Sequence, residues 1–373
     1  MVDCNSISKT VLVLTNSIGG LYSFRKEVMK AILDAGYGVT ISCPEMMPQA
    51  EYFKEIGCPV VILAYDRRGV NPFADFKLML EYKRMMRRME PTVVLTYTIK
   101  PNIYGGIAAR LAGIPQLANI TGLGDAVENG GRMQRLTVAL YKLGLSKTRK
   151  VFFQNASNRE FCISRGIASP NSTLLPGSGV NLQHHTYQPF PIDEGMVRFL
   201  FIGRLLKDKG IEEYFETAKA VRDKYPNTEF QILGMVEGPY QQSLDEMVRS
   251  GYIKHLGSTT DVRPFIGAVE CTIMPSYHEG MSNVNLESAA NGRPVITTDV
   301  PGCRETVDDG VTGILVNARD TQSLISGVEQ FLSLSYEQKR QMGIAAREKV
   351  EREFDRQKVI DAYLNEINLL SDV

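Results

Sequence analysis

Short runs of aliphatic and β-branched residues alternate with longer amphipathic stretches along the chain. The runs at residues 11–14, 39–42, 60–63 and 93–96 have the length and composition of buried strands. The stretches 24–35 and 76–89 repeat apolar residues at helical spacing. Strands that alternate with helices in this way predict a doubly wound parallel sheet of the α/β class.

The second half of the chain repeats this pattern. Strands are expected at 199–202, 230–233, 271–274 and 295–297, and a helix at 211–224. Between the halves, residues 176–194 are rich in Gly, Pro, His and Asn and have no clear period, which indicates a linker. For a chain of 373 residues we therefore expect two Rossmann-like domains, each with a ligand crevice at the carboxyl ends of its strands. The predicted domains are 1–188 and 189–353, followed by a helical segment, 354–373, that can pack back onto the first domain.

The charges are divided unequally between the halves, although the whole chain is neutral. Residues 1–188 hold 22 Lys and Arg against 13 Asp and Glu, and residues 189–373 hold 20 against 29, so the net charges are +9 and −9. In the segment 132–150, basic residues are interleaved with leucines, which suits an anionic membrane surface. The basic residues at its end are Lys142, Lys147, Arg149 and Lys150.

Other classes of protein are disfavoured by what the sequence lacks. No apolar run approaches the roughly 18 residues of a membrane span, and no motif reads a nucleic-acid groove, so no nucleic-acid partner is expected. The cysteines have neither metal-ligand nor redox spacing. We therefore expect a cytoplasmic protein that is peripheral on the inner face of the cell membrane.

In each half, a glycine-containing turn follows the first strand. After the first strand come Gly19 and Gly20, where backbone N–H groups at a helix start can approach a ligand; a plain tight turn is an equally good interpretation. After strand 199–202 come Gly203, Arg204 and Lys209. The two cations suit a diphosphate, although a solvated charged loop would have the same composition.

The most informative stretch follows strand 271–274. Glu279 stands in a loop, Ser282 or Asn283 can cap the next helix, and Glu287 lies about one turn inside it. One carboxylate near the free helical N–H groups and one further along the helix would suit sugar and ribose hydroxyl groups. Two surface glutamates would be the alternative, and the flanking apolar strand and Ala289-Ala290 argue against it.

These motifs together resemble the retaining glycosyltransferases called family 4. The resemblance rests on Glu279-x7-Glu287 preceded by Pro275-Ser276, on Gly203-Arg-Leu with Lys209-Gly210, and on Gly302-x-x-Glu305. It covers nearly the whole chain and is most specific over residues 200–316. It implies the GT-B fold, in which two Rossmann-like domains face each other across a cleft, and a nucleotide-sugar donor.

The resemblance also implies roles for single residues. Arg204 and Lys209 would hold the donor diphosphate, Glu279 the transferred sugar and Glu287 the ribose. Gly19 would approach the phosphates from the other side of the cleft. The implied catalytic residues are Glu279, Arg204 and Lys209, and the implied donor-binding residues are Gly19, Gly20, Gly203, Arg204, Lys209, Glu279, Gly280, Met281, Ser282, Asn283 and Glu287.

The first half resembles a subfamily that extends undecaprenyl-diphosphate-linked sugars in capsule, O-antigen or N-glycan assembly. The motifs are residues 97–105 and 119–124, which make Lys100, Asn119 and Thr121 the candidates on the acceptor side. Many family members have His at the position of Thr121, so no residue is assigned as the base. A front-face reaction, in which the leaving phosphate takes the acceptor's proton, needs none. The chain has no Asp-x-Asp motif, so neither a metal nor another cofactor is expected.

The sequence thus predicts transfer of a hexose or N-acetylhexosamine from a nucleotide diphosphate to a lipid-linked or saccharide acceptor. Uracil is the expected base and guanine the alternative. A nucleotide-sugar epimerase on the same fold is one competing hypothesis, although such enzymes lack the Glu279-x7-Glu287 element. A non-catalytic protein that binds sugar nucleotides is another, and transfer or hydrolysis of the donor would separate the three.

Overall fold

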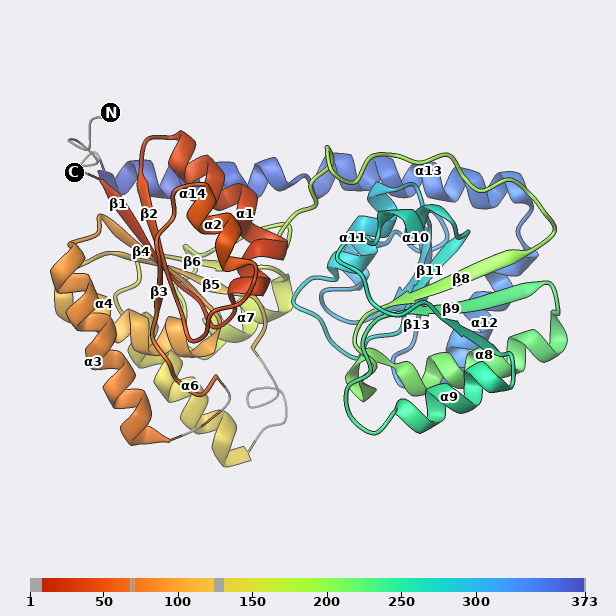
Figure 1. Ribbon diagram of the computed structural model, residues 1–373, viewed down its shortest axis with the longest axis horizontal. Coiled ribbons are helices and arrows are strands. Elements are labelled where there is room, and N and C mark those ends of the chain that lie inside the picture. The colour runs from red at the N-terminus through yellow and green to blue at the C-terminus, as the bar shows by residue number, and fades with distance from the viewer. Residues whose placement is uncertain (1–8, 68, 70, 124–130, 372–373) are drawn as a thin grey trace. The chain divides into compact units, whose positions relative to one another are not determined.

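The computed structural model describes residues 9–67, 69, 71–123 and 131–371 and divides the chain into two compact units. The first unit comprises Met1–Ser178 with Gln357–Val373, and the second comprises Gly179–Arg356. Each unit has one parallel sheet covered by helices on both faces (Figure 1). No helix among the described residues is long and apolar enough to cross a membrane.

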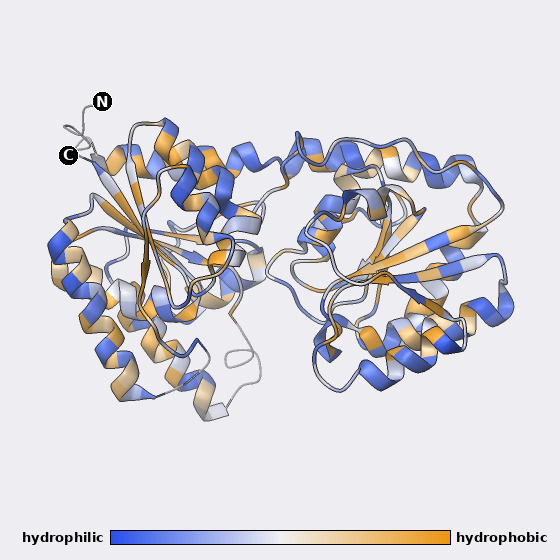
Figure 2. Ribbon diagram, viewed as in Figure 1, coloured by the Kyte–Doolittle hydropathy of each residue, from blue (hydrophilic) through white to orange (hydrophobic). Residues whose placement is uncertain are grey.

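The first sheet has the strand order β3-β2-β1-β4-β5-β6-β7, and every pairing in it is parallel. Its central strands β1 and β4 are buried on both faces and are nearly continuous in hydrophobicity, as Figure 2 shows. The strands are β1 (Thr10–Leu14), β2 (Gly38–Cys43), β3 (Val60–Ile62), β4 (Val93–Tyr97), β5 (Gln116–Ile120), β6 (Lys150–Phe153) and β7 (Thr173–Leu174).

Helices cover the two faces of this sheet. One face is packed by α1 (Ile18–Asp34), α2 (Ala50–Glu55) and α14 (Arg356–Ser371). The other face is packed by α3 (Pro72–Met89), the π-helical turn η1 (Pro101–Gly105), α4 (Gly106–Ala112) and α6 (Gly131–Leu145). The helix α7 (Ala156–Ser164) follows β6.

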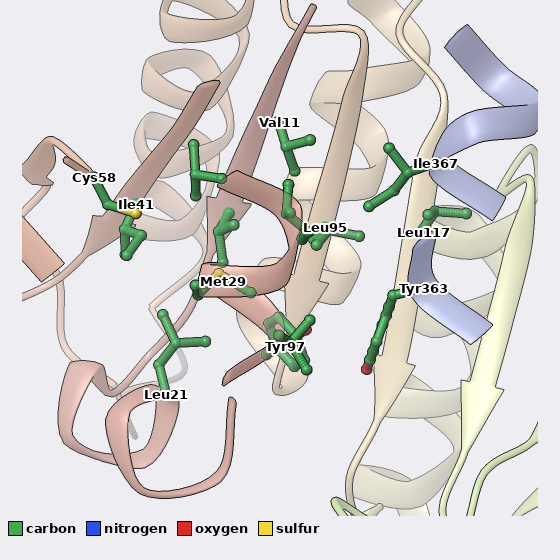
Figure 3. Packing of buried hydrophobic residues seen from close by; sticks show 14 of the residues in the cluster. Val11, Leu21, Met29, Ile41, Cys58, Leu95, Tyr97, Leu117, Tyr363 and Ile367 are labelled. Carbon is green, nitrogen blue, oxygen red and sulfur yellow. The ribbon is translucent and has the colours of Figure 1, made fainter. Parts of the chain in front are cut away.

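The last helix, α14, is part of the core of the first unit. Its Tyr363 and Ile367 are fully buried in the same cluster as Val11, Leu95 and Leu117 of the sheet (Figure 3). The packing of these side chains explains why residues from the end of the chain belong to the unit that begins it.

The second sheet has the order β10-β9-β8-β11-β12-β13 and is also parallel. Its strands are β8 (Val197–Ile202), β9 (Thr228–Leu233), β10 (Ile253–His255), β11 (Cys271–Met274), β12 (Val295–Thr298) and β13 (Gly313–Val316). The helical elements are η2 (Lys207–Lys209), α8 (Ile211–Lys224), α9 (Gln241–Arg249), α10 (Arg263–Gly267), α11 (Asn283–Ala290), η3 (Arg304–Thr306), α12 (Thr321–Ser333) and α13 (Tyr336–Glu353).

The structural division lies about ten residues before the expected boundary at 188. The segment that follows Ser178 is bound to the second unit by backbone hydrogen bonds. Val180 N donates to Phe354 O at 2.8 Å, and Gln188 N donates to Asn291 O at 3.3 Å. The segment after Ser178 has no helical or strand periodicity, so its sequence contains no sign of these contacts. The boundary predicted from the sequence is therefore later than the one in the structure.

Candidate functional site

The crevice of the second unit lies where the order of its strands reverses. β8 is the first strand of this sheet and lies between β9 and β11, so the loops that follow β8 and β11 leave the sheet on either side of the switch point. The loop after β8 contains Gly203, Arg204 and Lys209, and the loop after β11 contains Glu279. Topology therefore brings together two motifs that lie about 70 residues apart in the sequence.

Lys209 and Glu279 form an ion pair in this crevice. Lys209 Nζ donates to Glu279 Oε1 at 2.6 Å, and the two side chains are 18% and 16% exposed. Ser276 Oγ donates to the same carboxylate oxygen at 2.9 Å. The carboxylate is thus oriented by two donors and remains accessible at the surface of the crevice.

Close backbone packing holds the two loops together. Tyr277 N donates to Asp208 O at 2.8 Å. Gly210 has φ +72°, and a Cβ there would lie 2.1 Å from Pro275 O, so only glycine allows this approach. The Lys209-Gly210 motif therefore fixes the position of the loop that carries Glu279.

The loop after β12 supports Glu279 from the other side. Gly302 has φ +83°, and a Cβ there would lie 2.3 Å from Glu279 O. Glu305 Oε2 accepts a hydrogen bond from Gly302 N at 2.7 Å, and Gly302 O accepts one from Ser282 N at 2.7 Å. The Gly302-x-x-Glu305 motif thus holds the backbone of Glu279 and Ser282 in place by close packing and hydrogen bonds.

Arg204 does not share the Lys209–Glu279 pair. Its Nη1 lies 3.1 Å from Glu237 Oε2, and both side chains are more than 40% exposed. An exposed pair of this kind contributes little stability and is easily exchanged. The guanidinium is therefore available to another anion at little cost.

Glu287 lies in α11, whose N-terminus is capped by Ser282. Its side chain is half-buried, and no described residue donates a hydrogen bond to its carboxylate. Burial raises the pKa of Glu287 to about 7, against the opposing effect of the Arg356 charge. A half-buried carboxyl group that receives no hydrogen bond from the described residues can accept hydrogen bonds from a ligand.

Comparisons with known proteins identify this architecture. A family described as "Glycosyl transferase 4-like" matches residues 11–155, and one described as "Glycosyl transferases group 1" matches residues 197–333. The chain is a family 4 glycosyltransferase. Together the two matches cover the first sheet except β7, all strands of the second sheet, and the loops that carry Lys209 and Glu279.

The relatives of this glycosyltransferase include enzymes that act on lipid-linked sugars. It is 27% identical over 337 residues to the N,N'-diacetylbacillosaminyl-diphospho-undecaprenol alpha-1,3-N-acetylgalactosaminyltransferase of Campylobacter jejuni, covering 84% of this chain and 87% of that one. It is 24% identical to the UDP-Gal:alpha-D-GlcNAc-diphosphoundecaprenol alpha-1,3-galactosyltransferase of Escherichia coli, covering 78% of this chain and 79% of that one. The crystal structure of HepE from Anabaena with UDP and glucose has a TM-score of 0.79 at 17% identity, covering 98% of this chain and 100% of that one, which shows the GT-B fold.

The two donor-binding candidates of the first unit, Gly19 and Gly20, lie within a helix. The structure begins α1 at Ile18, several residues before the expected start at 24, so Gly19 and Gly20 form its first turn. Ser17 Oγ accepts a hydrogen bond from Gly20 N at 3.1 Å and caps the helix. The nearest atom that a Cβ at Gly19 would meet is Met47 Cε at 3.5 Å, an ordinary contact, so packing within the protein does not require glycine there.

Two of the acceptor-side candidates are buried and already have partners. Lys100 Nζ lies 2.6 Å from Asp75 Oδ1, and Tyr104 Oη donates to the other carboxylate oxygen at 2.9 Å. Asn119 donates to Thr96 O at 3.2 Å and accepts a short hydrogen bond from Tyr363 Oη. These side chains join η1 to α3 and β5 to α14, so a structural role accounts for both. Thr121, after β5, is the half-buried member of the set.

The remaining predicted donor residues surround the cap of α11. Met281 and Ser282 are buried, whereas Gly280 and Asn283 are half-buried. No group of three or more His, Cys, Asp or Glu side chains that could hold a metal ion occurs in the described part of the chain.

Sequence reasoning missed Arg25, which is only 4% exposed in α1. Its Nη1 donates to Phe24 O at 3.0 Å, and its guanidinium carbon lies 5.9 Å from the centre of the Tyr97 ring. The described residues place no carboxylate in an ion pair with it, and its buried Nε has no hydrogen-bond partner among them. A single arginine within a helical pattern gives no sign in the sequence that it points inward.

Proposed function

We propose that the enzyme transfers a hexose or N-acetylhexosamine from a UDP-linked donor, with retention of configuration, to a sugar carried on a lipid diphosphate. The observation that carries this proposal is the Lys209–Glu279 pair at the switch point of the second sheet. It is supported by Glu287 in the following helix, α11, whose carboxyl group receives no hydrogen bond from the described residues. The activities for which the Campylobacter and Escherichia relatives are named support a lipid-diphosphate-linked acceptor.

In the proposed donor complex, cations and carboxylates have separate tasks. Lys209 and Arg204 bind the diphosphate and stabilise the negative charge that develops on it as the glycosidic bond breaks. Glu279, oriented by Ser276, accepts hydrogen bonds from hydroxyl groups of the transferred sugar. Glu287 accepts hydrogen bonds from the ribose hydroxyl groups.

The proposed reaction takes place on one face of the sugar. The acceptor oxygen forms a bond to the anomeric carbon on the side from which the diphosphate leaves. The acceptor's proton passes to the departing phosphate oxygen, so no protein base is needed and the configuration is retained. The charge of the leaving group is neutralised by the two cations, and the proposal therefore includes no metal ion.

For the first unit, the proposal concerns its contact with the membrane that carries the acceptor. This unit carries 23 Lys and Arg against 16 Asp and Glu, a net charge of +7. We propose that it attaches peripherally to anionic bilayers at the cytoplasmic face, where a lipid-linked acceptor is found.

The decisive experiment is transfer from a panel of UDP- and GDP-sugars to a synthetic undecaprenyl-diphosphate-linked sugar, with and without a chelator. A product of one added sugar with a retained anomeric configuration, formed from a UDP-sugar in the chelator, is expected. Conversion of the donor into its epimer without transfer would favour the epimerase hypothesis. Binding without transfer or donor hydrolysis would favour a non-catalytic protein, and loss of activity in the chelator would overturn the metal-free route.

A further inference from the structure

Two helices of the first unit begin with large apolar side chains exposed to solvent. At the start of α3, Phe73 is 88% exposed and Phe76 is 59% exposed. In the first turns of α6, Met133 is 47% exposed and Leu136 is 55% exposed. Single exposed apolar residues are ordinary, but here four of them, two of which are phenylalanines, lie at two helix starts.

Both helix starts lie at the edge of the sheet where the strands end. α3 follows β3 and α6 follows β5, and a helix that follows a parallel strand starts from its carboxyl end. Figure 1 shows the N-terminal ends of both helices at the same end of the unit, and both helices pack against η1 and α4. We call Phe73, Phe76, Met133 and Leu136 the apolar tip.

The charges around the apolar tip favour an anionic surface. Lys77 and Arg135 are exposed beside it. Asp75 is the acidic residue in the first turn of α3, and it is buried against Lys100, whereas the first turn of α6 has no acidic residue. Apolar side chains bordered by cations, with the neighbouring carboxylate hidden, match the boundary between headgroups and acyl chains.

The basic cluster at the other end of α6 is a weaker candidate for the same contact. A helix of 15 residues separates its ends by roughly 20 Å, so Lys142 and Lys147 lie far from the start of α6. Lys150 Nζ is paired with Glu366 Oε1 at 3.0 Å, and Arg149 Nε lies 4.0 Å from Glu366 Oε2. This end of the helix points away from the edge where the strands end.

We propose that the apolar tip inserts into anionic bilayers, with Phe73 and Phe76 entering the acyl-chain boundary and Lys77 and Arg135 contacting headgroups. This proposal rests on the proposed function, because it specifies the membrane contact of that enzyme. Insertion at this edge brings the carboxyl ends of β4 and β5 to the membrane surface. A sugar on a membrane-bound diphosphate would then reach the crevice of the first unit without leaving the bilayer.

The chain contains no tryptophan, so an introduced one is a unique fluorescent probe. The experiment compares the full-length variants Phe73→Trp, Leu143→Trp and Ile192→Trp. Leu143 is 47% exposed near the other end of α6, and Ile192 is 79% exposed in the second unit. Each variant is mixed with vesicles of phosphatidylcholine alone or with phosphatidylglycerol, and quenching by brominated acyl chains reports the depth of the indole.

We expect a blue shift and quenching for Phe73→Trp on the phosphatidylglycerol vesicles, and neither for the two controls. In parallel, Phe73→Ser with Phe76→Ser should lower vesicle partition by about a hundredfold, since burial of one Phe is worth roughly tenfold or more. Lys142→Gln with Lys147→Gln should change it by less than about tenfold. Binding of UDP should be unchanged in every variant, which separates this proposal from the assignment of the donor site.

Quenching of Leu143→Trp in place of Phe73→Trp would overturn the proposal and move the contact to the basic cluster. Equal partition of the double Ser variant and the unmodified protein, or no partition of the unmodified protein at all, would overturn it too. Each of these results leaves the UDP measurement, and with it the transferase, intact.

Discussion

Replacing Glu287 with Gln should raise the stability of the second unit at pH 8 and lower its affinity for UDP. Glu287 has an ordinary pKa of 4.5 in water, and burial raises the folded-state pKa to about 7. Between these two values the folded protein keeps a proton that the unfolded chain has released. Stability is therefore lost as the pH rises through this range and stays low above pH 7.

The size of this effect follows from the shift in pKa. One pKa unit corresponds to about 1.4 kcal/mol, so ionised Glu287 costs the free protein up to about 3 kcal/mol at pH 8. Gln has almost the same shape and does not titrate. Glu287→Gln should therefore be the more stable protein at pH 8 and equal to the unmodified protein near pH 4.

Scanning calorimetry without nucleotide measures this difference as a change in Tm. The variant should melt several degrees higher at pH 8, because 1 kcal/mol shifts the Tm of a unit of this size by roughly 2–4 °C. Its affinity for UDP should fall about tenfold or more, since a neutral amide is a weaker acceptor for two ribose hydroxyl groups. Glu348→Gln, an exposed site on α13, is the control and should change neither quantity.

An equal gain in Tm of Glu287→Gln at pH 5 and pH 8 would contradict this prediction. In that case the carboxyl group is not destabilised by burial. A gain in stability with unchanged UDP affinity would retain the account of the pKa and remove Glu287 from the donor site.

Three further changes test other contacts. Glu279→Gln should lower turnover by about a hundredfold or more with near-normal UDP affinity, because the proposed charged hydrogen bond to the sugar would strengthen in the transition state; steady-state kinetics with calorimetric titration would detect both. Arg204→Ala should weaken UDP binding about tenfold and leave uridine binding unchanged, and equal losses for both ligands would contradict a contact with the diphosphate. Lys100→Met should destabilise the first unit by about 3–5 kcal/mol, because it leaves the carboxylate of Asp75 buried without its counter-charge. If that charge is the cause, adding Asp75→Asn should recover much of the lost Tm.

The sequence predicts buried strands well when they are runs of aliphatic residues. The expected strands at 11–14, 199–202 and 271–274 lie within β1, β8 and β11, and the helix expected at 211–224 has the bounds of α8. By contrast, β5 was not predicted as a strand. It contains Gln116 and Asn119, whose polar side chains are satisfied inside the protein and which therefore interrupt the hydrophobic pattern.

Polar residues in the first unit show the same limit of sequence reasoning. A lysine in a motif, such as Lys100, suggests a ligand, but its buried partner Asp75 comes from a helix that begins almost 30 residues earlier. The inward direction of Arg25 and the outward direction of Phe73 depend on how their helices pack against the sheet. Such directions follow from tertiary packing and have no local signal.

The motif residues of the second unit are close together because three neighbouring strands end beside one another. The loops after β8, β11 and β12 meet around Glu279, and Gly210 and Gly302 each contact the backbone of the loop after β11 at a position with positive φ. A side chain at either glycine would have to displace that loop, because the atoms it would meet are backbone carbonyl groups. The geometry of Glu279 therefore depends on residues that need not contact the donor. This dependence explains why glycines from two separate motifs accompany one carboxylate, and why that carboxylate can be oriented before a substrate arrives.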